Sequence, residues 1–454
     1  MEVDAVVVGL GPGGEQVAEE LAEAGLHVVG IEAELVGGEC PYWGCVPSKM
    51  MVRASNLLAE GRRIPGLAGE SVVRPDWALV ARRIREEATD FWDDKVAVDR
   101  FEEKGGHFVR GKARVTGPMS VEVGGETVTA RRALVLSTGQ HAFVPPMFAD
   151  VPHWTNRGAV AAETVPTSLL VVGGGAVGLE IGQVMGRFGA RVTIVESGPR
   201  LAGPEEPEAS ELITEVLRGE GVEVHTGAAI ERVEPMGETG ATVYLADGTA
   251  LSGARMLVAT GRCSDLAGLG VGVLGLDEEA QCIPVDGRMR VAPGVWAVGD
   301  VTGKGAFTHV AAFQARLCVA DILGRARPGA DYRAVPRVTF TDPEIGSVGL
   351  TEAMARAQGG DVTVFQESIA ASARGWIHRG EGFVKLVARD GVLVGATSMG
   401  PTGGEVLGLL VLAVHARVPL ETMRSMIFAY PTFHRAVDSA LWSPPSSEEK
   451  IAGA

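Results

Sequence analysis

A glycine pattern that occurs twice constrains the fold of this chain most strongly. Gly9, Gly11 and Gly14 form a G-x-G-x-x-G sequence between an apolar run at residues 3–9 and a helical pattern that opens at Glu15. In such a unit the first glycine makes a tight turn, the second lets backbone approach a pyrophosphate, and the third allows close helix–strand packing. Glu32 follows the next predicted strand, residues 27–31, where a carboxylate accepts the hydroxyls of an adenosine ribose. The spacing predicts a Rossmann-like dinucleotide site.

The whole unit returns later in the chain. Gly173, Gly175 and Gly178 follow a predicted strand at residues 168–172, and a second strand at residues 191–195 leads to Glu196. A repeated fold with two fingerprints predicts two bound dinucleotides. The Glu196 carboxylate suits a ribose 2′-hydroxyl and repels a 2′-phosphate. Arg200 would partly offset that repulsion, so a 2′-phosphate stays the alternative.

Two cysteines, Cys40 and Cys45, are separated by four residues in the segment GGECPYWGCVPSK, residues 37–49. A zinc site usually has Cys-x-x-Cys and a second ligand pair downstream, and neither is present, so no metal site is predicted. Two cysteines at the start of a helix can reach bonding distance if that turn distorts, and a helix N-terminus lowers the pKa of a thiol. The pair is interpreted as a redox dithiol that can close into a disulfide, with two ordinary buried thiols as the alternative.

The same segment resembles the active-site segment GG-T-C-x-x-x-G-C-V-P-S-K of the flavin-dependent pyridine nucleotide-disulfide oxidoreductases, which include dihydrolipoyl dehydrogenase and mercuric reductase. The resemblance runs along nearly the whole chain, although Glu39 stands where the family usually has Thr or Ser. It implies FAD at the first fingerprint and NAD(P)H at the second, with NADH favoured by Glu196. It also implies that Cys45 is the thiolate that contacts the flavin and that Cys40 faces the electron acceptor.

The resemblance assigns further residues around the two cofactors. Lys49 would pair with Glu180 beside the flavin, where hydride passes from the nicotinamide. Asp300 would hold the ribityl chain of FAD, and the helix opening at residues 308–311, which include His309, would direct its N-terminus at the flavin pyrimidine. Helix dipole and free N–H groups there would stabilise the anionic reduced ring. The family segments that close the two nucleotide-binding sections correspond to Thr138–Gly139 and to Gly261.

The resemblance breaks near the C-terminus. The family segment His-Pro-Thr-x-x-Glu supplies an acid–base histidine to the cysteines of the other subunit, but here Tyr430 and Arg435 replace the His and the Glu. A positioned acid–base contributes roughly 10²–10⁴-fold, and a tyrosine hydroxyl donates a proton but is a poor base at neutral pH. His434 is expected to be structural, and whether Tyr430 or His434 replaces the missing group is left open. Mercuric reductases also carry Tyr here, with a C-terminal cysteine pair that residues 443–454 lack.

The predicted fold is α/β, with two Rossmann-like dinucleotide-binding domains and a C-terminal α+β dimerisation domain that implies a homodimer. The expected divisions are residues 1–149 for the first part of the FAD-binding domain, 150–265 for the NAD(P)-binding domain, 266–332 for the central FAD-binding part and 333–454 for dimerisation. Other expectations are a long helix through Glu60, an amphipathic helical stretch over residues 76–104, and a hairpin of residues 383–389 and 392–396 on an Asp-Gly turn.

Composition excludes several partners. A net charge of −16 argues against a nucleic-acid partner. No apolar stretch is long enough to span a bilayer, and the acidic start of the chain is unlike a signal peptide. Five cysteines suit a reducing cytoplasm with one catalytic pair, and Cys263, Cys282 and Cys318 are expected to be inert core thiols.

The sequence therefore predicts an enzyme that passes electrons from NADH through FAD and the Cys40–Cys45 disulfide to a small-molecule acceptor. In the favoured hypothesis the acceptor is a disulfide or thiol-type substrate and Tyr430 donates the proton. In one alternative, electrons leave the flavin directly for a quinone or another small electrophile. In another, the chain is a redox-sensing flavoprotein without turnover.

Overall fold

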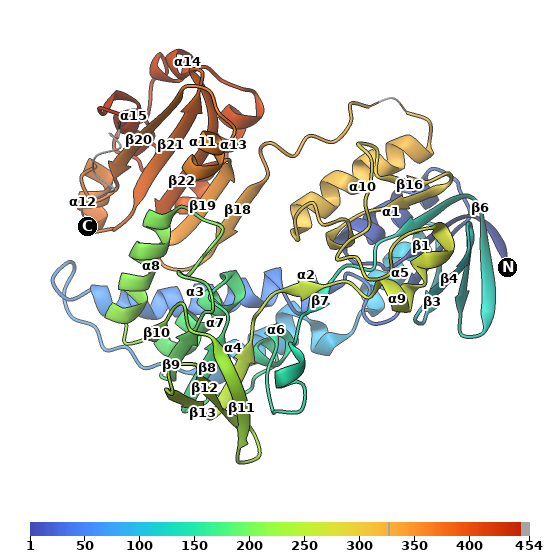
Figure 1. Ribbon diagram of the computed structural model, residues 1–454, viewed down its shortest axis with the longest axis horizontal. Helices are drawn as coiled ribbons and strands as arrows, with labels where there is room; N and C mark the ends of the chain where they lie inside the picture. Colours follow the sequence, from blue (N-terminus) through green and yellow to red (C-terminus); the bar gives the residue numbers. More distant parts are fainter. Residues whose placement is uncertain (326, 446–454) are drawn as a thin grey trace.

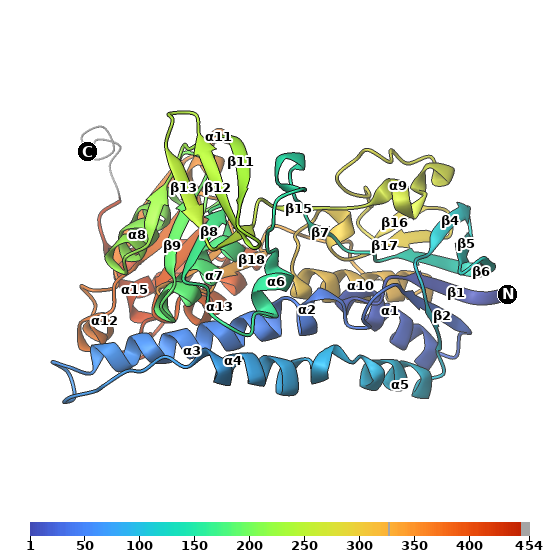
Figure 2. The ribbon, with the colours of Figure 1, turned by 90° about the horizontal axis from the view of Figure 1, so that it is seen from below.

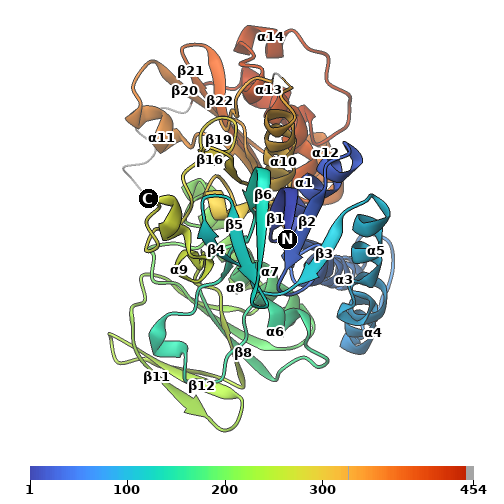
Figure 3. The same ribbon diagram turned by 90° about the vertical axis from the view of Figure 1, so that its right-hand side faces the viewer.

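The computed structural model describes residues 1–325 and 327–445. An eight-stranded sheet lies near the N-terminus (Figure 1), and its central strands follow the order β16-β17-β6-β1-β2-β3. In its parallel core Val6 lies opposite Val29 on one side and Leu134 on the other. Figure 3 shows the strands side by side. They are β1 (Glu2–Val8), β2 (Val28–Glu32), β3 (His107–Arg110), β4 (Arg114–Gly117), β5 (Ser120–Val123), β6 (Glu126–Leu136), β16 (Arg290–Ala292) and β17 (Val295–Ala297).

Two helices cover one face of this sheet. Helix α1 (Pro12–Glu23) begins with Pro12 in its first turn, where the missing N–H is tolerated. Its buried side chains, among them Val17 and Leu21, share an apolar core with residues of α10 (Thr308–Ile322). Because both helices start at the carboxyl edge of the sheet, their N-termini point to the same side.

The second fingerprint lies in a separate parallel sheet of order β10-β9-β8-β14. The predicted strands at residues 168–172 and 191–195 coincide with β8 and β9, and α7 (Ala176–Arg187) follows the glycines. A three-stranded antiparallel sheet and α8 (Pro207–Gly219) flank it. The strands are β8 (Ser168–Val172), β9 (Arg191–Val195), β10 (Glu223–His225), β11 (Ile230–Met236), β12 (Gly240–Leu245), β13 (Ala250–Gly253) and β14 (Arg255–Val258).

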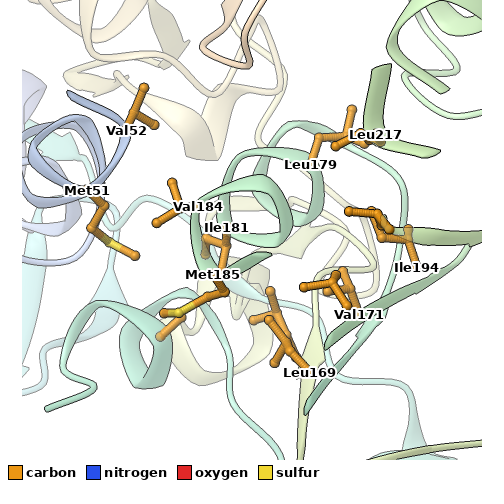
Figure 4. Packing of buried hydrophobic residues seen from close by; sticks show 14 of the residues in the cluster. Met51, Val52, Leu169, Val171, Leu179, Ile181, Val184, Met185, Ile194 and Leu217 are labelled. Atoms are coloured by element: carbon orange, nitrogen blue, oxygen red, sulfur yellow. The ribbon is translucent and has the colours of Figure 1, made fainter. Parts of the chain in front are cut away.

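A long helix, α3 (Cys45–Arg63), connects these units and begins at the second cysteine. Figure 2 shows it running from the end of α2 (Glu39–Tyr42) past α7, with α4 (Trp77–Arg83) alongside. Met51 and Val52 of α3 belong to one apolar core with Val184 and Met185 of α7 (Figure 4). The packing fixes the first turn of α3, and with it the cysteines, relative to the second fingerprint.

The predicted helical stretch at residues 76–104 consists of several helical segments and not of one continuous helix. It divides into α4 (Trp77–Arg83), a π-helical turn η1 (Ile84–Ala88), a 3₁₀ turn η2 (Asp90–Trp92) and α5 (Lys95–Glu103). Asp90, Phe91 and Trp92 have positive φ angles, and Trp92 stacks on Trp43 with ring centroids 5.3 Å apart. No glycine or proline marks this break, because tertiary contacts override the helical periodicity.

The C-terminal unit is an antiparallel sheet of order β18-β19-β22-β21-β20 with helices around it (Figure 1). The predicted hairpin is present, and Asp390 and Gly391 at its turn both have positive φ. The strands are β18 (Pro336–Thr339), β19 (Glu344–Gly349), β20 (Val362–Ser368), β21 (Phe383–Arg389) and β22 (Val392–Gly400). The helices are α11 (Glu352–Ala357), α12 (Ala373–His378), α13 (Gly403–His415), α14 (Leu420–Arg424) and α15 (Arg435–Trp442).

The remaining elements are short connections, and most lie between the two dinucleotide units. They are β7 (His141–Ala142), η3 (Pro146–Phe148), α6 (Asn156–Val160), β15 (Arg262–Cys263), α9 (Leu266–Leu269), η4 (Val271–Leu274) and η5 (Asp300–Thr302). In the part of the chain that the structure describes, no helix is long and apolar enough to cross a membrane.

A buried lysine joins the C-terminal unit to the unit that contains the second glycine fingerprint. Lys385 of β21 is 3% exposed and its ammonium lies 3.1 Å from Glu206, 2.7 Å from Glu208 and 2.9 Å from Glu352. Burial works against the charged form of Lys385, but its hydrogen bonds to Glu208 and Glu352 prevail and raise its pKa to about 12. Arg337 and Glu205 form another ion pair between the same units.

Candidate active site

The first glycine pattern borders a cleft of about 360 Å³. Gly9 has φ +88°, and a Cβ on Gly14 would lie 1.9 Å from the carbonyl oxygen of Gly9, so neither position accepts a side chain. A Cβ on Gly11 would meet nothing within 4 Å, which leaves that backbone open to the cleft. The Glu32 carboxylate accepts hydrogen bonds from the N–H groups of Leu10 at 2.7 Å and Glu34 at 2.8 Å. Burial raises the pKa of Glu32.

The opposite wall of this cleft comes from distant parts of the chain. Thr138 and Gly139 follow β6, Asp300 follows β17, and Arg262 belongs to β15. Burial raises the pKa of the Asp300 carboxyl. The buried Nε of Arg262 has no hydrogen-bond partner among residues 1–325 and 327–445, and it lies 3.9 Å from Asp300. A cationic donor of this kind is available to an anionic ligand.

The second glycine pattern borders a cleft of about 730 Å³ that Gly173, Gly175 and Gly261 help to line. Gly178 packs against the turn, because a Cβ there would lie 2.1 Å from the carbonyl oxygen of Gly173. The Glu196 carboxylate accepts hydrogen bonds from the N–H groups of Gly174 and Gly198, both at 2.6 Å. Glu196 is therefore held at the end of β9, where it lines the cleft.

Arg200 lines the same cleft, but its guanidinium is already engaged. It donates to the carbonyl oxygens of Gly203 and Glu205, both at 2.7 Å, and to the Ser210 hydroxyl at 2.8 Å. These bonds hold the guanidinium against the protein backbone. The sequence suggested that Arg200 would partly offset the repulsion between Glu196 and a 2′-phosphate, and this effect is therefore weakened.

Cys40 and Cys45 lie on α2 and at the first residue of α3, and both are free thiols. Cys45 is exposed, and its sulfur lies 3.3 Å from the Thr308 hydroxyl at the start of α10. The hydrogen bond between the two cysteines lowers the pKa of Cys45 to about 5, with help from Thr308 and the Lys49 charge. The same bond, together with burial, raises the pKa of Cys40 well above its ordinary value.

Lys49 and Glu180 meet between α3 and α7. The Lys49 ammonium donates to Glu180 Oε2 at 2.7 Å, and Glu180 Oε1 accepts the N–H of Phe340 at 2.9 Å. The Lys49 ammonium also lies 4.6 Å from the centroid of the Phe340 ring. The pair thus joins both dinucleotide units to the segment before β19.

The other predicted residues are dispersed. Tyr430 is 72% exposed in the single chain, and His434 precedes α15 and is half-buried. The His309 ring lies 3.0 Å from the carbonyl oxygen of Pro336 and stacks on Phe307, so its side chain points to the C-terminal unit.

The three remaining cysteines do not share one environment. Cys318 is buried, as predicted, and burial raises its pKa. Cys263 and Cys282 are half-buried, so the predicted core position is wrong for both. The Cys263 sulfur lies 3.1 Å from His141 Nε2, because β7 and β15 pair these two residues.

Sequence reasoning missed several residues that touch the site: Asn156, Arg157, Arg262 and Phe340, and it named residue 308 only as part of a helix N-terminus, not for the contact of the Thr308 hydroxyl with Cys45. None belongs to a recognisable spacing, because each reaches the site through a contact between distant segments. The one available signal was Glu39, a carboxylate at an unusual position, which requires a cationic partner somewhere in the fold. Among the described residues, no group of three or more His, Cys, Asp or Glu side chains is placed to hold a metal ion.

Two clefts bordered by the glycine patterns, together with a thiol pair that has one acidic sulfur, define a class: dinucleotide-dependent oxidoreductases with a dithiol centre. Residues 3–315 match the family described as pyridine nucleotide-disulphide oxidoreductase, and residues 335–441 match its dimerisation domain. The chain belongs to this family. It is accordingly an FAD-dependent NAD(P)H oxidoreductase of the disulfide reductase type.

Similar proteins span the whole chain. Dihydrolipoyl dehydrogenase from Chlorobaculum tepidum is 32% identical and covers 97% of this chain and 96% of its own. Mercuric reductase from Bacillus cereus is 30% identical, over 99% of this chain and 73% of its own. A Cu(II) complex of the HOCl-induced flavoprotein disulfide reductase RclA from Escherichia coli superimposes with a TM-score of 0.85 at 25% identity, covering 97% of this chain and 99% of the other.

The residues of the first cleft fit FAD. The open backbone at Gly11 lies at the N-terminus of α1, where N–H groups and the helix dipole attract a pyrophosphate. The held carboxylate of Glu32 suits ribose hydroxyls, and the orphaned Nε of Arg262 supplies a cation.

Proposed function

We propose that this chain is an NADH-dependent disulfide reductase that acts on a small-molecule disulfide or thiol-type substrate. The observation that carries this proposal is the asymmetric dithiol, in which Cys45 has a pKa of about 5 and the pKa of Cys40 is raised. Glu39 and Trp43, on either side of Cys40, line the first cleft. The overall reaction would convert NADH, a proton and a disulfide into NAD⁺ and two thiols.

FAD bound in the first cleft would supply two-electron transfer between the nicotinamide and the Cys40–Cys45 disulfide. The protein would hold Cys45 as a thiolate, because the Cys40 thiol, the Thr308 hydroxyl and the Lys49 ammonium all stabilise its charge. Cys40 keeps its proton and is the thiol proposed to exchange with the substrate. Lys49 would be held in place by its ion pair with Glu180.

Tyr430 is proposed to donate the proton to the departing substrate thiolate from the other copy in a homodimer. Its exposure in the single chain supports this assignment, because a second copy can reach it. The match of residues 335–441 to the family's dimerisation domain also supports a homodimer.

The proposed domain division follows the sheets. Residues 1–149 and 266–332 would form the FAD-binding part, because β16 and β17 pair into the sheet of β1 and β6. Residues 150–265 would bind NADH, and residues from 333 onward would form the dimerisation domain. Residues 446–454, which include part of the segment without cysteine, lie outside the described residues.

Removing the charge of Glu196 tests the preference for NADH. In Glu196→Gln the KM for NADH is expected to rise about tenfold, because a hydrogen bond to a charged acceptor contributes roughly 1.5–3 kcal/mol. The KM for NADPH is expected to fall, because the carboxylate no longer repels a 2′-phosphate. Steady-state kinetics with both nucleotides measure this change, and Glu223→Gln on the neighbouring strand β10 is the control. Equal KM changes for the two nucleotides would contradict the assignment.

A direct route from flavin to a quinone is the second candidate function. Tyr430 in place of a histidine favours it, because that route needs no acid–base at the dithiol. Turnover of Cys40→Ser with a lipoamide-type disulfide and with a quinone separates the routes. If the chain is a disulfide reductase, Cys40→Ser is expected to lower disulfide turnover by at least about 10³-fold. Any activity that remains in the variant would be with the quinone. A wild-type chain that reduces only the quinone, and a variant that retains all of that activity, would establish the direct route.

The non-catalytic alternative is tested by anaerobic titration with NADH. An enzyme shows rapid loss of the oxidised flavin absorbance and a long-wavelength band that disappears in Cys45→Ser. A chain whose flavin stays oxidised for minutes with NADH would be a sensor and not a reductase.

A further inference from the structure

Glu39 immediately precedes Cys40, and its carboxylate lines the first cleft beside Gly11 and Asp300. A carboxylate at this place would repel the pyrophosphate that the cleft fits. The site therefore requires something that neutralises Glu39 and holds it away from the ligand.

The structure supplies a cationic partner from α6. Arg157 donates from Nε at 2.8 Å and from Nη2 at 2.6 Å to Glu39 Oε1, while Asn156 donates to Glu39 Oε2 at 2.9 Å. Arg157 also lies 2.7 Å from Glu34, and Arg262 lies 3.9 Å from Glu39. The carboxylate is thus satisfied by charge-assisted hydrogen bonds to both of its oxygens.

The same helix holds the other end of the turn that carries Cys40. Asn156 Nδ2 donates to the carbonyl oxygen of Trp43 at 2.9 Å, and the Arg157 guanidinium lies 5.5 Å from the centroid of the Trp43 ring. Cys40 lies between these two anchored residues, so α6 contacts the turn on both sides of it.

Helix α6 is itself fixed to the second sheet. The N–H of Trp154 donates to Met256 at 2.7 Å and its carbonyl oxygen accepts the N–H of Val258 at 2.8 Å, so the chain before α6 pairs with β14. Ala159 and Val160 are buried in the core that includes α3 and α7. The anchor of Glu39 is therefore rigid.

We propose that Arg157 is a positioning residue that clasps the turn bearing Cys40 through Glu39 and compensates the Glu39 charge beside the first cleft. This rests on the proposed function, because it assigns FAD to that cleft and electron transfer to the dithiol. Glu39, Asn156 and Arg157 together are called the clasp. Without the clasp, Cys40 is no longer held against Cys45, and an unpaired carboxylate faces the anionic ligand.

The test uses holoenzyme of Arg157→Met, Glu39→Gln and the double variant Glu39→Thr with Arg157→Met. The first readout is FAD release on dilution, followed by the fluorescence of free FAD. Arg157→Met is expected to release FAD on the order of tenfold faster, since it leaves Glu39 unpaired. The double variant is expected to return toward the wild-type rate, because no carboxylate is left at position 39.

The second readout is the pH profile of iodoacetamide alkylation of Cys45 in NADH-reduced enzyme. The midpoint is expected to rise by about one pH unit or more in Arg157→Met and in Glu39→Gln, because Cys45 loses a hydrogen bond to its charged form. Arg157→Lys keeps the charge and is expected to retain the wild-type rate of FAD release. Arg85→Met, with similar exposure and its own ion pairs to Glu86 and Glu163, is the control.

A wild-type rate of FAD release together with an unchanged alkylation midpoint in Arg157→Met would overturn the proposed role of the clasp. If that variant does not fold, Glu39→Gln decides the question, and a wild-type alkylation midpoint in it overturns the proposal. Failure of the proposed function is distinguishable, because it appears as absent disulfide turnover in the wild-type enzyme, whatever these variants do.

Discussion

Serine in place of Cys45 is expected to lower NADH-driven disulfide reduction at least about 10³-fold, the scale on which loss of a covalent nucleophile lowers kcat in other enzymes. The pKa of Cys45 is about 5, so the wild-type sulfur is a thiolate throughout the neutral range. A serine hydroxyl does not ionise there and does not form a disulfide with Cys40. Stopped-flow reduction and steady-state turnover with a lipoamide-type disulfide measure the loss.

Cys263→Ser is the matched control, because it makes the same chemical change at a half-buried cysteine outside the pair. It is expected to leave turnover within about twofold of wild type. The acidic sulfur adds a pH signature: alkylation of reduced wild-type enzyme should persist down to about pH 5 and should be absent in Cys45→Ser. Full disulfide turnover by Cys45→Ser would refute the dithiol route.

Methionine in place of Lys385 is expected to lower the free energy of unfolding by about 3–5 kcal/mol, because it leaves a buried carboxylate uncompensated. Glu206 is 4% exposed at its side chain, and in the variant no ammonium would balance it. The midpoints of thermal and urea unfolding of the holoenzyme measure the loss. Lys95→Met is the control, since its ion pair with Asp99 is exposed and screened by solvent.

The stability lost in Lys385→Met depends on the pH at which unfolding is measured. The pKa of Lys385 is raised to about 12, above the ordinary lysine value near 10.4, so its contribution is fully present below about pH 10 and is lost as pH rises through 12. Burial opposes ionisation of Glu352, but its contacts with Lys385 prevail and lower its pKa. The comparison therefore belongs at pH 8. If the unfolding midpoint of Lys385→Met equals that of Lys95→Met, the three carboxylates do not need the lysine for stability, and the prediction is wrong.

The fold could be predicted where a local pattern determines a local structure. Each fingerprint combines a buried apolar strand, a glycine turn and a helix, so β8 and β9 have the predicted bounds. The Asp-Gly turn likewise located β21. Strand β6 begins at Glu126, and its first half, which pairs with β5, lacks the continuous apolar run that marks a doubly buried strand in a sequence.

The site was only partly predictable, for a physical reason. Lys49 and Glu180 meet as the resemblance implied, although 131 residues separate them. Arg157 reaches Glu39, next to Cys40, from a helix whose own sequence carries no catalytic motif, and the helix N-terminus that the resemblance assigned did not reveal the contact of Thr308 with Cys45. The engaged guanidinium of Arg200 was equally invisible, because its acceptors are mostly backbone carbonyls. Contacts of this kind depend on the assembled fold and leave no periodicity in the chain.

The hydrogen bond from Phe340 to Glu180 has a consequence for engineering. A chimaera that takes its C-terminal unit from a relative would also import the backbone that orients the Lys49–Glu180 pair, and the neighbouring Asp342 binds both Arg63 and Arg187. The safest fusion point therefore lies after residue 344, so that residues 336–344 stay together with the helix that bears Glu180. Swapping units at that boundary would leave the Lys49–Glu180 charge pair undisturbed.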